Sequence, residues 1–281
     1  MTASKMRILL FGGNPTASAI SVRLTHAGYD CVHIISGTEE NLRYHLSFGD
    51  AVFRGSRTVE GLTAATFSEE KLAEDVARGL SEDELLFENI AFMLSDKKIP
   101  VLHNVAIDTA IAVVNPAAIV LTEKMDSPPL LDSANLVIGL HPLHTAGTDC
   151  HIVVDSRLCQ TLGSVVTPGE EIREGLTIDN RFFNDPFVYC HSPIPGAWIA
   201  SKSIGDGVEE NEALGKIENI EIRSPYAGQV WGIAHSGRLI DARGAVDMIL
   251  QGEDSEDVYQ LDFRERAVAG GVLEAGLRFS K

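Results

Sequence analysis

Residues 6–13 read MRILLFGG, and this stretch decides the expected fold. Its first six residues form the kind of apolar run that is buried on both faces of a parallel sheet, and the run stops at Gly12-Gly13. Apolar residues at roughly helical spacing follow from Thr16 to Ala27, and Gly28 is placed to end that helix. Tyr29 to Ile35 has the composition of a second strand. The stretch therefore predicts a βαβ unit with the usual right-handed crossover.

The chain beyond this unit continues to alternate helical and strand-like patterns. Two helical patterns fall between Glu69 and Asp96, and short apolar runs then follow at 99–103, 117–122, 136–140 and 152–154. Beyond about Leu162 the sequence changes to many short strands separated by Gly, Pro, Asn and Asp. We place a boundary near residue 165, which gives an α/β chain with a Rossmann-like domain over residues 1–165 and a β-rich domain over residues 166–281.

The β-rich part contains a weak internal duplication. One half is PGAWIASKSIGDGVEENEALGKIE and the other is SPYAGQVWGIAHSGRLIDARGAVDMIL, and both have a turn, a strand, a glycine-containing turn and a second strand. This pattern resembles the barrel-sandwich hybrid fold of biotinyl and lipoyl domains. Those carriers present a lysine on the central hairpin, but here the hairpin is Glu218 to Glu221 and Lys216 comes too early, which argues against a swinging-arm carrier. The terminal RAVAGGVLEAGLRF is predicted to form a final helix.

Composition narrows the class of partner. The net charge of −17 comes from 40 acidic and 23 basic residues, and without a compensating basic block it disfavours duplex nucleic acid and anionic membranes. The longest apolar stretch, Ala110 to Thr122, is interrupted by Asn115-Pro116 and is shorter than the roughly 20 residues of a membrane span. Four cysteines without a CxxC pair, and no recognisable signal peptide, predict reduced thiols in the cytoplasm.

The glycine turn is the first candidate site. A dinucleotide-binding fingerprint is GxGxxG, whereas Gly12, Gly13 and Asn14 are followed by a proline and no third glycine. Amides at a helix N-terminus can hold a phosphate, but Asn14 or Thr16 can equally cap the helix with no ligand. The sequence leaves nucleotide binding and a purely structural turn both open.

The second candidate site is the loop HPLHTAGTDCH at residues 141–151. His141, His144 and His151, with Asp149 and Cys150, offer zinc or iron ligands after a predicted strand, although their spacing matches no standard metal motif. A loop whose polar side chains cap backbone groups is the alternative. The sequence contains no GxSxG or Walker A motif, so hydrolase and kinase functions have no positive support.

Four segments resemble the YqeB-type accessory proteins of selenium-dependent molybdenum hydroxylases. They are the opening glycine turn with RLTHAGY at residues 23–29, LRYHLSFGDAVFRGSRTVEGLTA at 42–64, the loop at 141–151, and RAVAGGVLEAGL at 266–277, of which the second is the most specific. His141, Leu143 and His144 stand where the family has Gly, Gly and Phe, and Asp155 and Arg157 keep part of a further family segment. The chain thus resembles a divergent member. The matching residues are Phe48, Ala51, Val52, Gly55, Val59, Glu60, Gly61, Thr145, Ala146, Gly147, Asp149, His151, Gly270, Gly271 and Glu274, with Lys124 matching a lysine at a strand end.

The resemblance implies an accessory or maturation factor for molybdenum hydroxylases. Such a factor would bind a nucleotide or a molybdopterin-type cofactor at the interface of its two domains, and its partners would be a molybdenum hydroxylase or other maturation proteins. Its expected contacts are Gly12, Gly13, Asn14, Lys124, Thr145, Gly147, Asp149 and His151. Two alternatives remain open: an oxidoreductase that uses NAD(P) or a flavin, and a non-catalytic assembly protein whose β-rich domain docks a hydroxylase subunit.

Overall fold

The computed structural model describes residues 5–35, 41–67, 81–125, 130–170, 186–252 and 255–279. Its chain divides into two compact units. The first comprises Met1–Thr38, Ser47–Ile178 and Leu261–Lys281, and the second comprises Glu39–Leu46 and Asp179–Gln260. The predicted boundary near residue 165 therefore falls inside the first unit, to which the last helix also belongs.

The first unit is built on a nine-stranded sheet with the order β3-β4-β5-β2-β1-β6-β7-β8-β9. The seven strands from β4 to β8 are parallel to one another, whereas β3 and β9 at the two edges are antiparallel to their neighbours. The strands are β1 (Arg7–Phe11), β2 (Asp30–Ile35), β3 (Ser56–Val59), β4 (Leu62–Ala65), β5 (Lys98–His103), β6 (Ala118–Leu121), β7 (Leu136–His141), β8 (Ile152–Asp155) and β9 (Val165–Val166). The helices are α1 (Pro15–His26), α2 (Ala51–Arg54), α4 (Glu82–Ser95), α5 (Ile107–Val114) and α6 (Phe263–Phe279).

Most of the predicted elements of this unit are present. The strand, helix and strand predicted over residues 6–35 are β1, α1 and β2, and the later apolar runs are β5 to β8. Of the two helical patterns between Glu69 and Asp96, the second is α4, which begins with a capping box between Ser81 and Glu84. The first, which consists of Leu72, Val76 and Leu80, lies outside the described residues.

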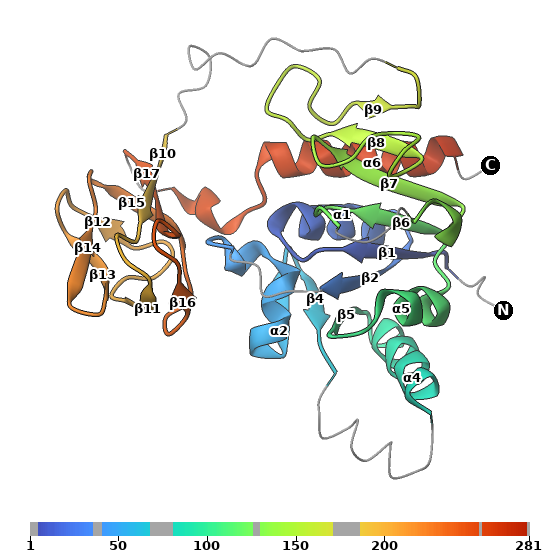
Figure 1. Cartoon of the computed structure of the whole chain (residues 1–281), viewed down its shortest axis with the longest axis horizontal. Coiled ribbons are helices and arrows are strands. Elements are labelled where there is room, and N and C mark those ends of the chain that lie inside the picture. Colours follow the sequence, from blue (N-terminus) through green and yellow to red (C-terminus); the bar gives the residue numbers. More distant parts are fainter. Residues whose placement is uncertain are drawn as a thin grey trace. The chain divides into compact units, whose positions relative to one another are not determined.

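Helix α6 returns from the end of the chain to the first unit and packs against α1 and β8 (Figure 1). The close approach depends on Gly271, because a Cβ atom there would overlap the carbonyl oxygen of Gly163 and come within 2.7 Å of Val154 Cγ1. The hairpin between β3 and β4 also contacts α6, since Arg266 donates to the carboxylate of Glu60. Several residues that carry the family resemblance, such as Glu60 and Gly271, thus hold α6 in place.

The second unit contains two four-stranded antiparallel sheets, ordered β10-β17-β15-β12 and β14-β13-β11-β16. Its strands are β10 (Phe187–His191), β11 (Gly196–Ala200), β12 (Gly207–Val208), β13 (Ala213–Ile217), β14 (Ile220–Arg223), β15 (Gly228–Ile233), β16 (Leu239–Ile240) and β17 (Ala245–Gln251). A core around the fully buried Trp198 joins them, and Leu42 from the early segment of the chain packs against it. Lys216 lies within β13, outside the Glu218–Asn219 turn that connects β13 to β14.

The expected fold class, a Rossmann-like domain followed by a barrel-sandwich domain, is wrong. The first sheet is mixed and has nine strands, with antiparallel pairs at both edges, and the β-rich unit forms two separate antiparallel sheets. The prediction missed the hairpin of β3 and β4 because its strands are only four residues long and its turn, Glu60-Gly61, lay inside a motif attributed to the family resemblance. Both turn residues have positive φ, at 45° and 82°, as a two-residue hairpin requires.

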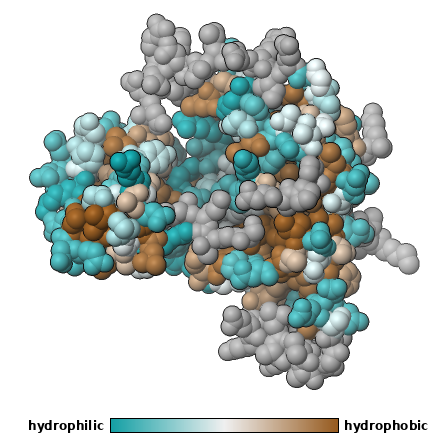
Figure 2. Space-filling model, in the orientation of Figure 1, coloured by the Kyte–Doolittle hydropathy of each residue, from teal (hydrophilic) through white to brown (hydrophobic). Residues whose placement is uncertain are grey.

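The surface combines hydrophilic residues with local apolar groups. On the face shown in Figure 2, hydrophobic side chains gather on the second unit where β13 and β14 lie, and Ile220 of β14 is 40% exposed. Among the residues that the structure describes, no helix has both the length and the apolar character required to span a bilayer.

Candidate functional site

The strand order reverses between β1 and β6. From β1 the chain adds β2 and β5 on one side, and β6, β7 and β8 follow on the other. In parallel sheets, ligands bind in the crevice beyond the carboxyl ends of the strands at such a reversal, because the loops there diverge to opposite faces. Gly12 and Gly13 follow β1 at this position, and Glu123 and Lys124 follow β6. We define these four residues together with Asn14 as the switch-point site.

The two glycines are required by contacts within the protein. Gly12 has φ of 112°, and a Cβ atom on it would lie 2.5 Å from Glu123 Oε1. A Cβ atom on Gly13 would lie 2.5 Å from the Cα atom of Gly49. The carbonyl oxygen of Gly13 accepts hydrogen bonds from the Gly49 amide, at 2.9 Å, and from the Ser47 hydroxyl. The turn is therefore packed closely between the end of β6 and the segment before α2.

The glycine turn's polar groups already have partners. The amide of Gly13 donates to Glu123 Oε1 at 3.3 Å, and Asn14 caps α1 by accepting from the Ala17 amide at 2.9 Å. The hydroxyl of Ser18 donates to the Asn14 carbonyl oxygen and accepts from the Phe48 amide. A carboxylate thus occupies the position beside the helix N-terminus where a dinucleotide-binding protein holds a phosphate.

Beneath the turn lies His33, a fully buried residue of β2. Its Nδ1 atom lies 2.8 Å from the Gly12 carbonyl oxygen and its Nε2 atom lies 2.6 Å from the Ser21 hydroxyl. Burial lowers the pKa of His33 to about 4, so the ring is neutral at pH 7. Because a carbonyl oxygen only accepts, Nδ1 carries the proton and donates to Gly12, and Nε2 accepts from Ser21.

Two functional candidates at this site, His33 and Glu123, were not predicted from the sequence. His33 is the one ionisable residue in the otherwise apolar stretch from Val32 to Ile35, and a lone polar residue in a buried strand is the signal that could have identified it. Glu123 stands two residues after the end of a buried strand. Lys124, which was predicted, follows it directly and is exposed.

The loop at residues 142–151 does not join the switch-point site as a unit. It leaves the carboxyl end of β7 and returns to the amino end of the parallel strand β8, where His151 immediately precedes Ile152. There His151 Nδ1 accepts from the Val137 amide at 2.9 Å. The carboxylate of Asp149 accepts from the Thr145 amide at 2.9 Å, and Gly147 adopts the positive φ of 80° that the turn needs. These residues therefore cap and shape the loop.

The three candidate metal-ligating histidines lie at different places. His141 ends β7 at the carboxyl edge of the sheet, and His151 lies at the amino edge. His144 is buried, with its Nδ1 atom 3.3 Å from the amide nitrogen of Leu140, and Gly139 packs closely against it. In the part of the chain that the structure describes, no three or more His, Cys, Asp or Glu side chains are grouped so as to hold a metal ion.

The buried carboxylate of Asp155 forms an ion pair with the partly exposed Arg157 at the end of β8. Arg157 donates through Nε at 2.9 Å and Nη2 at 2.8 Å, and the Thr161 hydroxyl donates at 2.6 Å. Burial alone would raise the pKa of Asp155, but the hydrogen bonds from Arg157 and Thr161 lower it to about 2. These hydrogen bonds fix the turn that leads from Asp155 to Gly163, and Gly163 packs against α6.

Comparison with known proteins identifies one relative in sequence. The chain is 27% identical over 273 residues to the "Uncharacterized protein YqeB" of Escherichia coli (strain K12), which covers 95% of this chain and 47% of that protein. The chain therefore spans about half the length of the curated relative it matches. This similarity confirms the resemblance to YqeB, whereas a role with selenium-dependent hydroxylases stays a prediction. No family model matches the chain.

The solved structures that resemble this chain have low TM-scores with it. A succinylglutamate desuccinylase/aspartoacylase from Rhodobacter sphaeroides has 12% identity and a TM-score of 0.25, covering 90% of this chain and 87% of that one. The ectoine utilization protein EutE (DoeB) from Ruegeria pomeroyi has 13% identity and a TM-score of 0.26, covering 88% and 86%. An aspartoacylase family protein from Mesorhizobium loti has 10% identity and a TM-score of 0.23, covering 88% and 86%. Scores of this size do not establish a shared fold.

Proposed function

We propose that this chain is an accessory protein of the YqeB type that binds a guanine nucleotide or a pterin at the switch-point site. The observation that carries the proposal is the pair Glu123-Lys124 beside the amide of Gly13, at the carboxyl ends of β1 and β6. The sequence similarity to YqeB supports the assignment to that type. Maturation of molybdenum hydroxylases is the role that the resemblance implies for it.

The chemistry of the pair favours a particular ligand. Guanine and pterin rings share an edge on which a ring N–H and an exocyclic amino group point the same way, and a carboxylate accepts both hydrogens at once. Glu123 is half-buried and accepts from the amide of Gly13, and a carboxylate has about four acceptor sites on its two oxygens. Lys124 is exposed at the next position and supplies a cation for the ligand's phosphate.

The same geometry disfavours a pyrophosphate on the glycine turn. A phosphate placed there would meet the Glu123 carboxylate at close range, and the amide of Gly13 is already engaged by that carboxylate. The NAD(P)- or flavin-dependent oxidoreductase therefore has less support than the proposed ring-binding site. Docking of a hydroxylase subunit by the second unit stays a separate prediction, for which co-purification with a molybdenum hydroxylase is the test.

Calorimetric titration of the full chain with GMP and with a pterin monophosphate tests the proposal. Glu123→Gln replaces half of the acceptor pair by a donor, and we expect it to weaken both ligands by roughly 10- to 100-fold, since a hydrogen bond to a charged group contributes about 1.5–3 kcal/mol. Lys124→Ala should weaken only the phosphorylated ligands, and guanosine should bind that variant as it binds the wild type.

Two substitutions away from the site provide matched controls. Glu88→Gln and Lys98→Ala remove the same charges from exposed positions in α4 and β5. They should leave both affinities unchanged. The proposal is overturned if the wild-type chain binds neither ring, or if the control variants weaken binding as much as the site variants do.

A further inference from the structure

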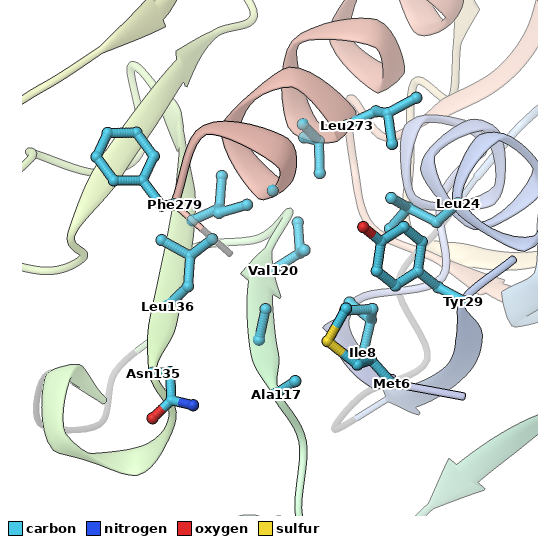
Figure 3. A pocket seen from close by; sticks show the side chains of 14 residues that line it. Met6, Ile8, Leu24, Tyr29, Ala117, Val120, Asn135, Leu136, Leu273 and Phe279 are labelled. Carbon is cyan, nitrogen blue, oxygen red and sulfur yellow. The ribbon is translucent and has the colours of Figure 1, made fainter. Parts of the chain in front are cut away.

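The opposite, amino-terminal edge of the same sheet contains an apolar cavity of about 370 Å³. Figure 3 shows it beneath α6, with Phe279 and Leu136 on one side, Tyr29 and Leu24 on the other, and Val120 between them. All of its lining residues belong to the first unit. None of them belongs to the switch-point site.

The floor of the cavity is one face of the sheet. Ile8 pairs with Ala118, Ala118 pairs with Leu136, and Val120 pairs with Ile138, so these side chains alternate onto a common face of β1, β6 and β7. Ala118 stands at the centre of this row, where its neighbours are larger. The short side chain leaves depth in the floor that a branched residue would fill.

The wall formed by α6 contains a second small residue, Gly276. A Cβ atom added to Gly276 would meet no atom within 4 Å, whereas one added to Gly271 in the same helix would overlap the backbone of Gly163. A glycine inside a helix costs about 1 kcal/mol relative to alanine, and at Gly271 the close packing of α6 explains it. At Gly276 no such packing exists, and the missing side chain leaves open space along the cavity.

A second hollow, of about 440 Å³, adjoins the apolar one, and the two share Met6, Ala117 and Asn135. This neighbouring hollow is polar and is lined by the cations Lys5 and Arg7. Lys5 lies 3.5 Å from the carboxylate of Asp30 and is exposed, while Arg7 donates to the carbonyl oxygen of Val114 at 3.3 Å. Among the described residues, only Lys5 of the two is paired with a carboxylate, so this hollow keeps a positive charge in a chain whose net charge is −17.

We infer that the two hollows together bind an amphipathic organic anion, with an aliphatic chain in the apolar cavity and a carboxylate beside Arg7 and Lys5. A dry cavity of about 150 Å³ is enough for benzene, so 370 Å³ has room for roughly ten to fifteen carbon atoms. Medium-chain carboxylates match both the volume and the charge. Because the polar hollow adjoins the apolar one at Asn135, a linear molecule reaches both.

Titration of the full chain with decanoate tests this inference. Decanol and hexanoate serve as comparison ligands, because one lacks the charge and the other lacks the length. Gly276→Leu fills the cavity from the α6 wall and should weaken the binding of decanoate by roughly tenfold or more, since it removes the space that the alkyl chain of the ligand would occupy. Gly270→Leu is the matched control, because Gly270 lies in the same helix, also has open space at its Cβ position and does not line the cavity.

Two further variants test the anion and keep the result interpretable if Gly276→Leu does not fold. Arg7→Gln should reduce the preference for decanoate over decanol. Phe279→Glu places a negative charge at a half-exposed position on the cavity's edge, where it should weaken decanoate more than decanol. Binding of decanoate by the wild type and by Gly276→Leu with equal affinity would overturn the cavity site. Equal affinity for decanoate and decanol in the wild type would overturn the anion site.

Discussion

The buried carboxyl group of Asp247 gives a sharp prediction about pH and stability. Asp247 lies in β17, is 0% exposed, and faces Cys190 of β10 and Ile233 of β15 across the sheet. Neither of its carboxyl oxygens has a hydrogen-bond partner in the described structure. Burial raises the pKa of Asp247 to about 8, so the folded chain holds a neutral carboxylic acid here at pH 7.

The sign of the effect follows from proton linkage. A carboxyl group in the unfolded chain has a pKa near 4, so between about pH 4 and pH 8 the folded state holds a proton that the unfolded state has lost. The contribution of this group to the stability of the second unit is therefore fully present below about pH 4, and it is lost as the pH rises through about 8. The slope approaches about 1.4 kcal/mol per pH unit, which amounts to about 4 kcal/mol at pH 7. Asp247→Asn removes the titration and should make the second unit more stable than wild type by up to this amount at pH 7.

Tryptophan fluorescence isolates the unit in question. The chain's two tryptophans, Trp198 and Trp231, are both buried in the second unit, so urea unfolding followed by fluorescence reports on that unit. We expect the wild-type midpoint to fall between about pH 5 and pH 9 and the Asp247→Asn midpoint to stay level. Asp241→Asn removes an exposed charge from the same part of the chain and serves as the control. Equal pH profiles for the wild type and Asp247→Asn would refute the reasoning.

Three further predictions concern the first unit, whose helices make far-UV circular dichroism its natural reporter. Gly271→Ala should lower the stability of the unit by about 3 kcal/mol or more because its Cβ overlaps the backbone of Gly163, whereas Gly270→Ala, with open space, should raise it by up to about 1 kcal/mol. The lowered pKa of His33 means that stability falls as pH is reduced from about 6.5 to 4, and His33→Asn should flatten that dependence in urea titrations. Asp155→Asn should cost about 2 kcal/mol in thermal unfolding, and a wild-type-like melting temperature would contradict the role of its ion pair.

The central strands of the first sheet could be predicted from the sequence. Continuous apolar runs such as that of β1 can be buried on both faces, so their type and position follow from local pattern alone. The edges could not be predicted in the same way. Strands β3 and β9 have four and two residues, and their state depends on pairing with β4 and β8, which no local pattern encodes.

The candidate site was predictable where neighbours in sequence remain neighbours in space. Gly12, Gly13 and Asn14 form one turn, and parallel pairing brings Lys124 to the same edge because β1 and β6 are adjacent. The prediction that Asp149 and His151 belong to the same site assumes that their loop stays at the carboxyl edge of the sheet, where it begins. The loop instead runs back to the amino end of β8 with no helix, and the direction of a crossover without helical periodicity is set by tertiary packing.

Glycines show most clearly what separates the two candidate sites in this unit. Gly12 and Gly13 follow the pattern of a phosphate-binding turn, but side chains at these positions would collide with Glu123 and Gly49. The atoms that pack closely against the two glycines therefore belong to the protein and not to a ligand. Gly276 sits in an ordinary helical pattern and is not identified by any motif, but it leaves space beside an apolar floor. A glycine in the sequence can mean that neighbouring atoms pack against the backbone there, or that space is left open beside it. Only the packing around its Cβ position distinguishes these two cases. On that criterion, the ligand that we propose for the switch-point site would be bound by the Glu123 and Lys124 side chains, whereas the ligand that we propose for the amino-terminal cavity would fill space.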